Sequence, residues 1–435
     1  MNLLNLSWKN LWYKPLNTSL SVLLFALGVG LISLLFLLQK QLQDNFEKNL
    51  AGIDLVVGAK GSPLQLILSS MYHIDAPTGN ITLKEARPFL NPKHPLIEKA
   101  IPLAMGDSYK GYRIVGTTSD LLSLYGAELA SGAVWAKNFE VTLGARVAQD
   151  LHLNIGDLFQ SSHGFDDNED LSHADAHAFK VVGILQPTGA VVDQLILTTP
   201  QSFWLVHEHE EETNTEEAHE HTEVQPEPGE AEHQEVAHHH DELPKPLLEE
   251  DENKDITAIL IQFKGRTNFQ ALNMGRSINE NTDLQAATPA IEINRVFAQM
   301  DSGERVLRIL ALVIIIVSAL SIFISLYSSL KERKYELALM RVMGAGPGKL
   351  FRLIILEGIV LAVLGYLIGI LISHGGMEII AGFMRDSYQY SFSGWQFLNE
   401  EWVLLLGTLG IGFIAAIIPA MQASRMAIAE TLSQG

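Results

Sequence analysis

Residues 309–330 read ILALVIIIVSALSIFISLYSSL, a run of 22 positions without a charged side chain. A helix needs about 20 apolar residues to cross the hydrocarbon core of a bilayer, where its backbone polar groups must be satisfied within the helix. Three further stretches, 20–38, 353–373 and 403–421, are also long and apolar enough. The sequence therefore predicts four transmembrane helices.

The first apolar stretch, 20–38, has a second interpretation, because a signal peptide also combines basic residues with an apolar core. This core is longer than that of most signal peptides, and no A-x-A-like cleavage site follows it. Residues 39–50 form a polar continuation that is compatible with a helix. We therefore expect an uncleaved membrane anchor.

Basic residues near the predicted spans indicate the orientation of the chain, because cytoplasmic loops carry an excess of lysine and arginine. They lie before the first span, between the second and third, and after the fourth: Lys9, Lys14, Lys331, Arg333, Lys334, Arg341, Lys349, Arg352 and Arg425. The loop 374–402 contains Arg385 as its only lysine or arginine. We expect residues 1–19 (an entry helix), 331–352 and 422–435 to be cytoplasmic, and residues 39–308 and 374–402 to lie outside.

The large segment 39–308 alternates short β-like runs with turns and a few helices, which is typical of an α+β domain. Candidate strands are Asp54–Val57, Tyr112–Val115, Glu140–Leu143, Phe179–Ile184, Gln194–Thr198 and Ala258–Phe263. Candidate helices are 145–151 and 268–279, and residues 291–308 are expected to continue as a stalk helix into the second span. The predicted fold class is a membrane α-helical protein with a large α+β domain inserted between transmembrane helices 1 and 2.

An acidic segment, Leu205–Asp255, accounts for most of the formal net charge of −20, because it contains 19 acidic residues, two lysines and eight histidines. Such a segment cannot bury enough apolar surface to offset its ordering entropy. We expect residues 205–255 to be a disordered insertion. The acidity also argues against nucleic acid as a partner, which requires a basic surface. The chain has no cysteine, which excludes disulfides and thiolate metal sites.

Residues 331–346, KERKYELALMRVMGAG, form the most informative motif. Charged residues fill its first turn, Leu337, Leu339, Met340 and Met343 then supply an apolar face, and Gly344 is typical of a helix stop. On physical grounds alone, this pattern also fits a solvated amphipathic turn with basic membrane anchors.

The motif resembles the coupling segment of FtsX/MacB/Lol-type permeases, which typically reads E-R-x-x-E-x-A-x-x-x-x-x-G-A. The matching positions are Glu332, Arg333, Glu336, Ala338, Gly344 and Ala345. Residues 8–15, the third span with Leu356-Glu357-Gly358, Gly365 and Gly369, and the outer-domain stretches 143–157 and 179–184 are also similar to this family. The C-terminus matches at Pro419-Ala420, Ala423-Ser424-Arg425, Glu430 and Leu432. Ala427-Ile428 replaces the family's Asp-Pro, which puts the partner contact of the tail in doubt.

The resemblance implies a non-catalytic permease subunit of a MacB-type ABC transporter in the bacterial inner membrane, with a MacB-like periplasmic domain. In this family two permeases, copies or paralogues, form a dimer on separate ATPase subunits that bind ATP and magnesium, and no cofactor is expected on this chain. ATP-driven closure moves the coupling segment, and the stalk helices transmit the motion to the outer domain. The residues carried over to this coupling role are Glu332, Arg333, Glu336, Leu337, Met340, Arg341 and Gly344.

A glycine-rich stretch at 344–349 faintly resembles a phosphate-binding loop, but it lacks the first glycine and the final Ser or Thr of GxxxxGK[ST]. ATP hydrolysis is therefore expected on a separate chain.

Glu357 is the one ionisable residue well inside a predicted span, where a charge costs about 2.5–3.5 kcal/mol at a helix centre. Because it lies near the cytoplasmic end, pairing with a basic loop residue could offset that cost. A structural or coupling role is favoured over proton handling.

Histidines and carboxylates in the outer domain raise the question of cargo, because both side chains suit zinc and similar divalent ions. Candidate metal ligands are His163, His173, Asp175, His177, His207, His209, His219, His221, His238, His239 and His240. We expect loose, exchangeable zinc binding, and divalent metal is the first candidate cargo. Lipoprotein or lipid extraction, peptide or drug export, and FtsX-like regulation of a periplasmic hydrolase are alternatives. A periplasmic binding protein or another envelope protein is a further expected partner.

Overall fold

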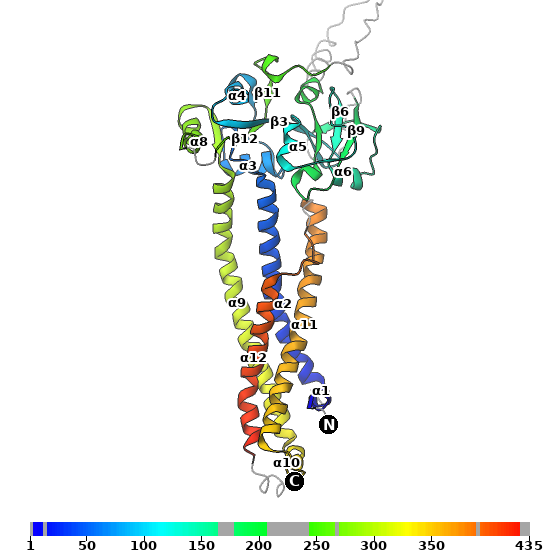
Figure 1. Cartoon of the computed structure of the whole chain (residues 1–435), viewed down its shortest axis with the longest axis vertical. Helices are drawn as coiled ribbons and strands as arrows, with labels where there is room; N and C mark the ends of the chain where they lie inside the picture. The colour runs from blue at the N-terminus through cyan, green and yellow to red at the C-terminus, as the bar shows by residue number, and fades with distance from the viewer. Residues whose placement is uncertain are drawn as a thin grey trace, which may run out of the picture. The chain divides into compact units, whose positions relative to one another are not determined.

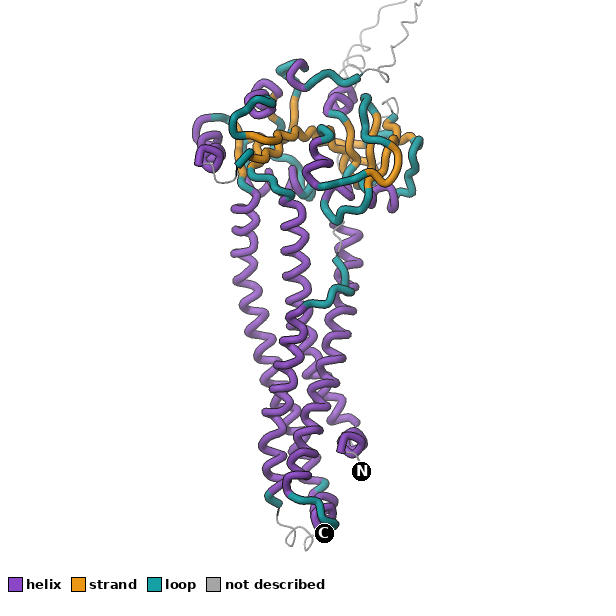
Figure 2. Tube along the Cα trace, in the orientation of Figure 1, coloured by secondary structure: helices purple, strands orange, loops and turns teal. Residues whose placement is uncertain are grey.

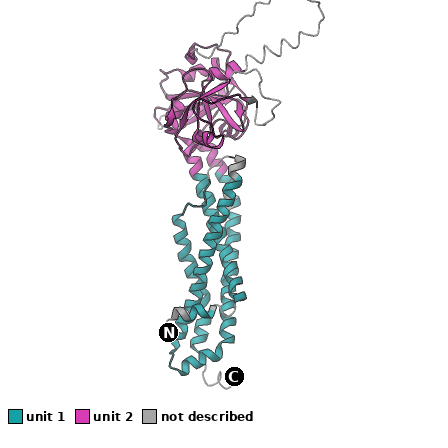
Figure 3. Ribbon diagram, turned by 90° about the vertical axis from the view of Figure 1, so that its right-hand side faces the viewer, with its two compact units in different colours: residues 1–43, 297–435 teal, residues 44–296 magenta. Residues whose placement is uncertain are grey.

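The computed structural model describes residues 3–11, 15–163, 178–206, 243–265, 269–388 and 392–426. The chain divides into two compact units, which Figure 3 shows in different colours. Unit 1 comprises Met1–Gln43 and Phe297–Gly435, and unit 2 comprises Asp44–Val296.

Unit 1 is helical. It contains most of the long helices α2 (Pro15–Leu50) and α9 (Pro289–Glu332), each of which has one end in unit 2. It also contains the long helices α11 (Pro347–Tyr388) and α12 (Asn399–Ser424) and the short helices α1 (Leu3–Leu11) and α10 (Lys334–Val342) (Figure 1). Four helical stretches are long and apolar enough to cross a membrane: Thr18–Leu50, Arg305–Glu332, Pro347–Phe383 and Asn399–Ser424. The prediction of four membrane-length helices is thus confirmed, and each helix extends beyond the apolar run that predicted it.

The predicted loop 374–402 is partly wrong, because α11 continues to Tyr388. Met377 and Ala381, four residues apart on one helix face, are buried in a cluster with Leu37, Phe392 and Leu398. This apolar face favours helix over loop. Residues 392–398, which we call the connecting strap, lead into α12.

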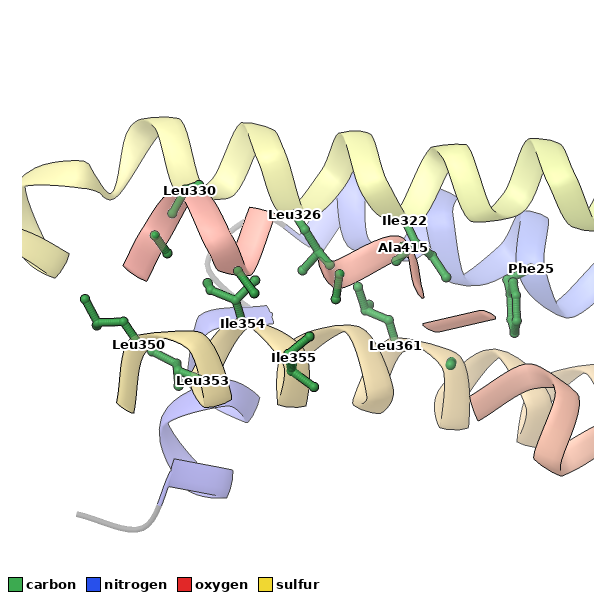
Figure 4. Packing of buried hydrophobic residues seen from close by; sticks show 14 of the residues in the cluster. Phe25, Ile322, Leu326, Leu330, Leu350, Leu353, Ile354, Ile355, Leu361 and Ala415 are labelled. Atoms are coloured by element: carbon green, nitrogen blue, oxygen red, sulfur yellow. The ribbon is translucent and has the colours of Figure 1, made fainter. Parts of the chain in front are cut away.

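An apolar core joins α2, α9, α11 and α12 in unit 1, as Figure 4 shows for residues such as Phe25, Ile322, Ile354 and Ala415. Glycines bring the helices close together. A Cβ atom at Gly358 of α11 would lie 2.8 Å from the Gly412 carbonyl oxygen of α12, and one at Gly412 would lie 2.9 Å from the Gly358 carbonyl oxygen.

The G-x-x-x-G pair Gly365 and Gly369 faces α2, where added Cβ atoms would collide with Phe25 and with the Ala26 carbonyl. These small residues therefore allow α11 and α2 to approach closely within the chain. Gly407 and Gly410 have no such neighbour within 4 Å.

Unit 2 is built on an 11-stranded mixed sheet (Figure 2). Its main path runs β13-β1-β12-β3-β4-β10-β6-β9-β5, with β7 on β9 and β8 on β3. The bounds are β1 Leu55–Ala59, β3 Ile97–Tyr109, β4 Tyr112–Gly116, β5 Leu129–Gly132, β6 Glu140–Leu143, β7 Leu158–Phe159, β8 Ser162–His163, β9 Phe179–Leu185, β10 Ile196–Thr198, β12 Ala258–Phe263 and β13 Leu284–Ala287. Strands β2 (Ile81–Thr82) and β11 (Asp255–Ile256) form a separate pair.

The described helices of unit 2 include α3 (Pro63–Met71), α4 (Leu83–Leu90), α5 (Asp120–Tyr125), α6 (Ala145–Asp150) and α8 (Phe269–Asn281), and residues 200–206 are also helical. Two apolar cores cover the two halves of the sheet, one around Val57, Ile259 and Ile278 and the other around Val141 and Val181. The long strand β3 pairs with β12 in one half and β4 in the other.

The predicted α+β pattern is confirmed, and β6 and β12 have the predicted bounds. The sequence reasoning missed β3, the longest strand. Pro102 interrupts its pattern and argues against a central strand, yet β12 pairs across this position, with Ile259 opposite Pro102.

The predicted disordered insertion 205–255 is too long at both ends. Val206 is buried in the second core, and the Trp204 indole Nε1 donates to the Asp255 carbonyl (2.7 Å). Arg87 of α4 contacts the Glu252 carboxylate and donates to the Glu250 carbonyl (2.8 Å). Residues 243–255 therefore pack on unit 2, and residues 207–242 lie outside the described residues.

Candidate functional site

The predicted coupling segment folds into helix α10, which a sharp turn separates from α11. Gly344 has a φ of +96°, a left-handed conformation that favours glycine. Its amide donates to the Arg341 carbonyl (3.1 Å), and the Ala345 amide donates to the Met340 carbonyl (3.0 Å). Pro347 then begins α11, a position that proline suits because its missing N–H is not needed there. The prediction of Gly344 as a helix stop is confirmed.

Arg333, between α9 and α10, is the centre of a buried polar contact. Its Nη1 donates to Glu357 Oε1 of α11 (3.4 Å), and its Nε donates to Glu336 Oε2 one turn further along (3.2 Å). The Asn10 side chain of α1 donates to the same Glu357 oxygen (2.7 Å). One carboxylate thus ties together α1, the α9–α10 junction and α11.

This arrangement explains how a carboxylate is accommodated within an apolar span. Glu357 is 2% exposed and Arg333 is 6% exposed. A buried charge is tolerated when a counter-charge and hydrogen bonds satisfy it, and removing one partner costs far more than the pair itself contributes. The expected pairing of Glu357 with a basic residue of the coupling segment is therefore confirmed, and that residue is Arg333.

Helix α10 has one buried face and one exposed apolar face. Leu337 and Ala338 are 1% exposed, and Leu337 packs in the core of unit 1. Tyr335, Leu339, Val342 and Met343 are exposed, and their spacing places them on one side of the helix. The apolar face predicted from sequence therefore divides: Leu337 faces inward, Met340 is half-buried, and Leu339 and Met343 face outward.

The other predicted coupling residues have different surroundings. Glu332 and Glu336 are exposed, and Arg341 Nη1 donates to the Met426 carbonyl just after α12 (2.7 Å). The C-terminal motif contributes Ala420 and Ala423 to the buried core, while residues 427–435 lie outside the described residues. The segment is thus anchored on one side by Arg333, Leu337 and Arg341.

A second buried carboxylate, Glu401 in the first turn of α12, was not singled out by the sequence. Glu401 Oε1 accepts from Ser33 Oγ of α2 (3.1 Å) and lies 2.9 Å from His374 Nε2 of α11. Ser373 Oγ donates to Ser33 Oγ (2.9 Å). Ser373, His374 and Glu401 fell in or beside a predicted loop, and the acidic first turn of α12 was the available signal.

The candidate metal ligands cannot be assembled into a site from the part of the chain that the structure describes. The backbone of His163 pairs with Asp107 across β8 and β3, and nothing is described of its side chain. His173, Asp175, His177, His207, His209, His219, His221, His238, His239 and His240 lie outside the described residues. Among the described residues, no group of three or more His, Asp or Glu side chains could hold a metal ion.

These features define a membrane protein with four long apolar helices, a mixed α/β unit and a short amphipathic helix between the second and third long helices. A family model described as the MacB-like periplasmic core domain matches residues 18–237, and one described as the FtsX-like permease C-terminal domain matches residues 308–428. The chain therefore belongs to the MacB/FtsX family of ABC transporter permeases. This family consists of non-catalytic permease subunits that normally work with an ATPase subunit.

The chain is also similar to the ABC transporter permease YtrF of Bacillus subtilis, with 25% identity over 131 residues. The aligned region covers 27% of this chain and 29% of that relative. The chain thus matches less than a third of the length of this relative.

Proposed function

We propose that this chain transmits the ATP-driven motion of a separate ATPase subunit, received at α10, across the inner membrane to unit 2. In this proposal α1, α10 and the C-terminus are cytoplasmic and unit 2 is periplasmic. Two permeases, copies or paralogues, stand on two ATPase subunits. The excess of lysine and arginine in the predicted cytoplasmic segments supports this orientation.

The division of α10 into two faces carries the proposal. Leu337 and Arg333 fix one face to the core of unit 1, and Tyr335, Leu339, Val342 and Met343 leave an apolar patch exposed on the other. Exposed apolar residues flanked by charged ones mark protein–protein contacts. A helix bound to its own bundle on one side and open on the other suits the transfer of a partner's motion into that bundle.

Co-purification tests this contact. Tagged full-length chain is purified from its native membrane, and the associated ATPase is identified by mass spectrometry. Leu339→Asp and Met343→Asp should reduce the recovered ATPase about tenfold or more, because each would bury an unpaired carboxylate in the interface. Leu272→Asp, an equally polar change at an exposed leucine of α8, is the matched control. Unchanged recovery with both α10 variants would remove the proposal.

Orientation has its own test, because the chain has no cysteine and single cysteines can be introduced. Lys334→Cys on α10 should be protected from a membrane-impermeant maleimide in spheroplasts, and Lys84→Cys on exposed α4 should react. Labelling of both positions from the same side would contradict the proposed topology.

We also propose divalent metal, with zinc first, as the cargo or regulator. The support is the composition of residues 205–255, which include eight histidines and 19 carboxylates. ATPase activity of the purified complex is measured with and without zinc, for the full chain and for a deletion of residues 207–242. A zinc response that disappears with the deletion supports metal handling. ATPase turnover that is unaffected by zinc and by the deletion would contradict the metal proposal.

A further inference from the structure

A cavity of about 400 Å³ lies in unit 1 between α11 and the connecting strap. Aliphatic side chains of α11, including Leu367 and Leu371, line it together with the aromatic rings of Trp395 and Phe397 from the strap. His374 and Glu378 supply its ionisable groups. A cavity of this size, mostly apolar with a few polar groups, is typical of a small-molecule site.

The strap is held firmly enough to form a cavity wall. The Gln41 side chain of α2 donates to the Ser393 carbonyl (2.7 Å) and accepts from the Ser393 amide (2.9 Å). The Gly394 amide donates to Glu378 Oε2 (2.9 Å), and the Gly394 carbonyl contacts His374 Nδ1. A Cβ atom at residue 394 would lie 2.3 Å from the His374 carbonyl oxygen, so only glycine permits this approach.

A glycine of α11, Gly375, leaves one side of the cavity open. Gly375 lines it, and a Cβ atom there would meet no heavy atom within 4 Å. A glycine inside a helix costs about 1 kcal/mol relative to alanine. Close helix packing explains that cost at Gly365 and Gly369, but among the described residues none would contact a Cβ atom at Gly375. A side chain at position 375 would fill part of the cavity.

The two ionisable groups of the cavity differ in their surroundings. Both ring nitrogens of His374 face acceptors, the Gly394 carbonyl and Glu401 Oε1, and its ring packs on Phe397 with centroids 4.6 Å apart. Glu378 is exposed and accepts only the Gly394 amide among the hydrogen bonds described, so its carboxylate can also meet a cationic ligand beside aromatic rings that attract cations.

We propose that this cavity binds a single-chain amphiphile with a protonated amine head group. The apolar chain lies against Leu367, Leu371 and Trp395, and the ammonium donates to Glu378. Trp395 is 80% exposed, as an aromatic residue at a membrane interface would be, so an amphiphile dissolved in the bilayer reaches the cavity directly. This inference goes beyond the coupling function and does not depend on it, because binding needs neither ATPase nor nucleotide.

The test uses the full chain in phosphatidylglycerol nanodiscs and three photoreactive dodecyl probes bearing a diazirine, with an amine, a hydroxyl or a sulfate head. The amine probe should label peptides within residues 367–397 at concentrations at least tenfold below those needed for the sulfate. Equal labelling by amine and sulfate, or labelling spread over the exposed face of α9, would overturn the proposal.

Three variants separate the site from general membrane labelling. Gly375→Phe fills the cavity and should reduce amine labelling at least tenfold, whereas Gly376→Phe is the matched control, because its Cβ is equally unhindered and it does not line the cavity. Glu378→Gln keeps an acceptor for the Gly394 amide and should weaken the amine probe while leaving the hydroxyl probe unchanged. Insensitivity of the amine probe to both Gly375→Phe and Glu378→Gln would refute the assignment.

Lysophosphatidylethanolamine, a single-chain membrane lipid with an amine head group, is added to the nanodiscs to identify the source of the amine. Competition by this lipid supports occupation by a membrane lipid, and absence of competition supports a free amphiphile as the ligand. Thermal unfolding of each variant checks that its fold is intact.

Discussion

The buried contact between Arg333 and Glu357 offers a direct measure of what holds α10 to the helical unit. Arg333→Ala leaves the Glu357 carboxylate, which is 2% exposed, facing the Asn10 amide without its cation. At the observed 3.4 Å, Coulomb's law gives an attraction of about 5 kcal/mol for an effective dielectric constant of about 20. Breaking one side of a buried ion pair typically costs about 3–5 kcal/mol. Because 3.4 Å is long for a charged hydrogen bond, we expect a loss of about 3 kcal/mol.

A double-mutant cycle measures this value. Arg333→Ala, Glu357→Gln and the double variant are unfolded with SDS in mixed micelles, and helix loss is followed by circular dichroism. Glu357→Gln should cost less than Arg333→Ala, because the glutamine oxygen still accepts from Asn10 and the buried Arg333 cation keeps Glu336 as its counter-charge. The double variant should cost less than the two single variants together, with a coupling energy of about 1–3 kcal/mol.

Lys334→Ala is the matched control, since Lys334 is the exposed neighbour of Arg333 on α10. It should change stability by no more than about 0.5 kcal/mol. Strictly additive effects in the cycle, or an Arg333→Ala variant as stable as Lys334→Ala, would show that the buried pair does not anchor the coupling helix.

Two further outcomes follow from the structure. Gly358→Ala should destabilise unit 1 by about 1–3 kcal/mol, because its Cβ would lie 2.6 Å from that of Ala416, whereas Gly410→Ala has open space and should be neutral or stabilising in the same SDS titration. Burial, and then the nearby Arg113 guanidinium, lower the pKa of His73 to about 3 from an ordinary value of 6.5. The unfolded state therefore takes up a proton as pH falls below 6.5 while the folded state does not, so unit 2 should lose up to about 2 kcal/mol of stability between pH 6.5 and pH 5. His73→Asn, which tolerates the positive φ of 53°, should flatten this pH dependence in thermal unfolding of the full chain, and an unchanged slope would contradict it.

The helical unit could be predicted from sequence because the bilayer imposes a strong local requirement. Residues 309–330 predict a transmembrane helix from their own sequence, independently of the rest of the chain. The ends of the helices were harder to predict from the sequence. Beyond Ser373 the continuous apolar run stops, and α11 is apolar only on the face that contains Met377 and Ala381. That face depends on Leu37, which is more than 300 residues away in the chain.

The buried polar contacts show the same limit. Glu357 was recognisable as a charge in need of a partner, and the basic segment 331–352 was the expected source. The choice of Arg333, and the contribution of Asn10 from α1, follow only from the packing of distant helices. In unit 2, the acidic composition of residues 205–255 predicted disorder for the whole segment. Composition does not reveal individual contacts, such as the hydrogen bond from the Trp204 indole to the Asp255 carbonyl, which order residues 243–255.

The positions of the two buried carboxylates bear on how motion would travel through unit 1. Glu357 and His374 are 17 residues apart on α11, about 25 Å along a helix. At one end Glu357 is tied to Arg333 and Asn10, and at the other His374 is tied to Glu401 and, through it, to Ser33. Between them, Gly365 and Gly369 pack closely against Phe25 and the Ala26 carbonyl of α2. A helix fixed to its neighbours at both ends and closely packed in the middle moves with them as one body. This arrangement supports the proposed transmission by displacement of the helices.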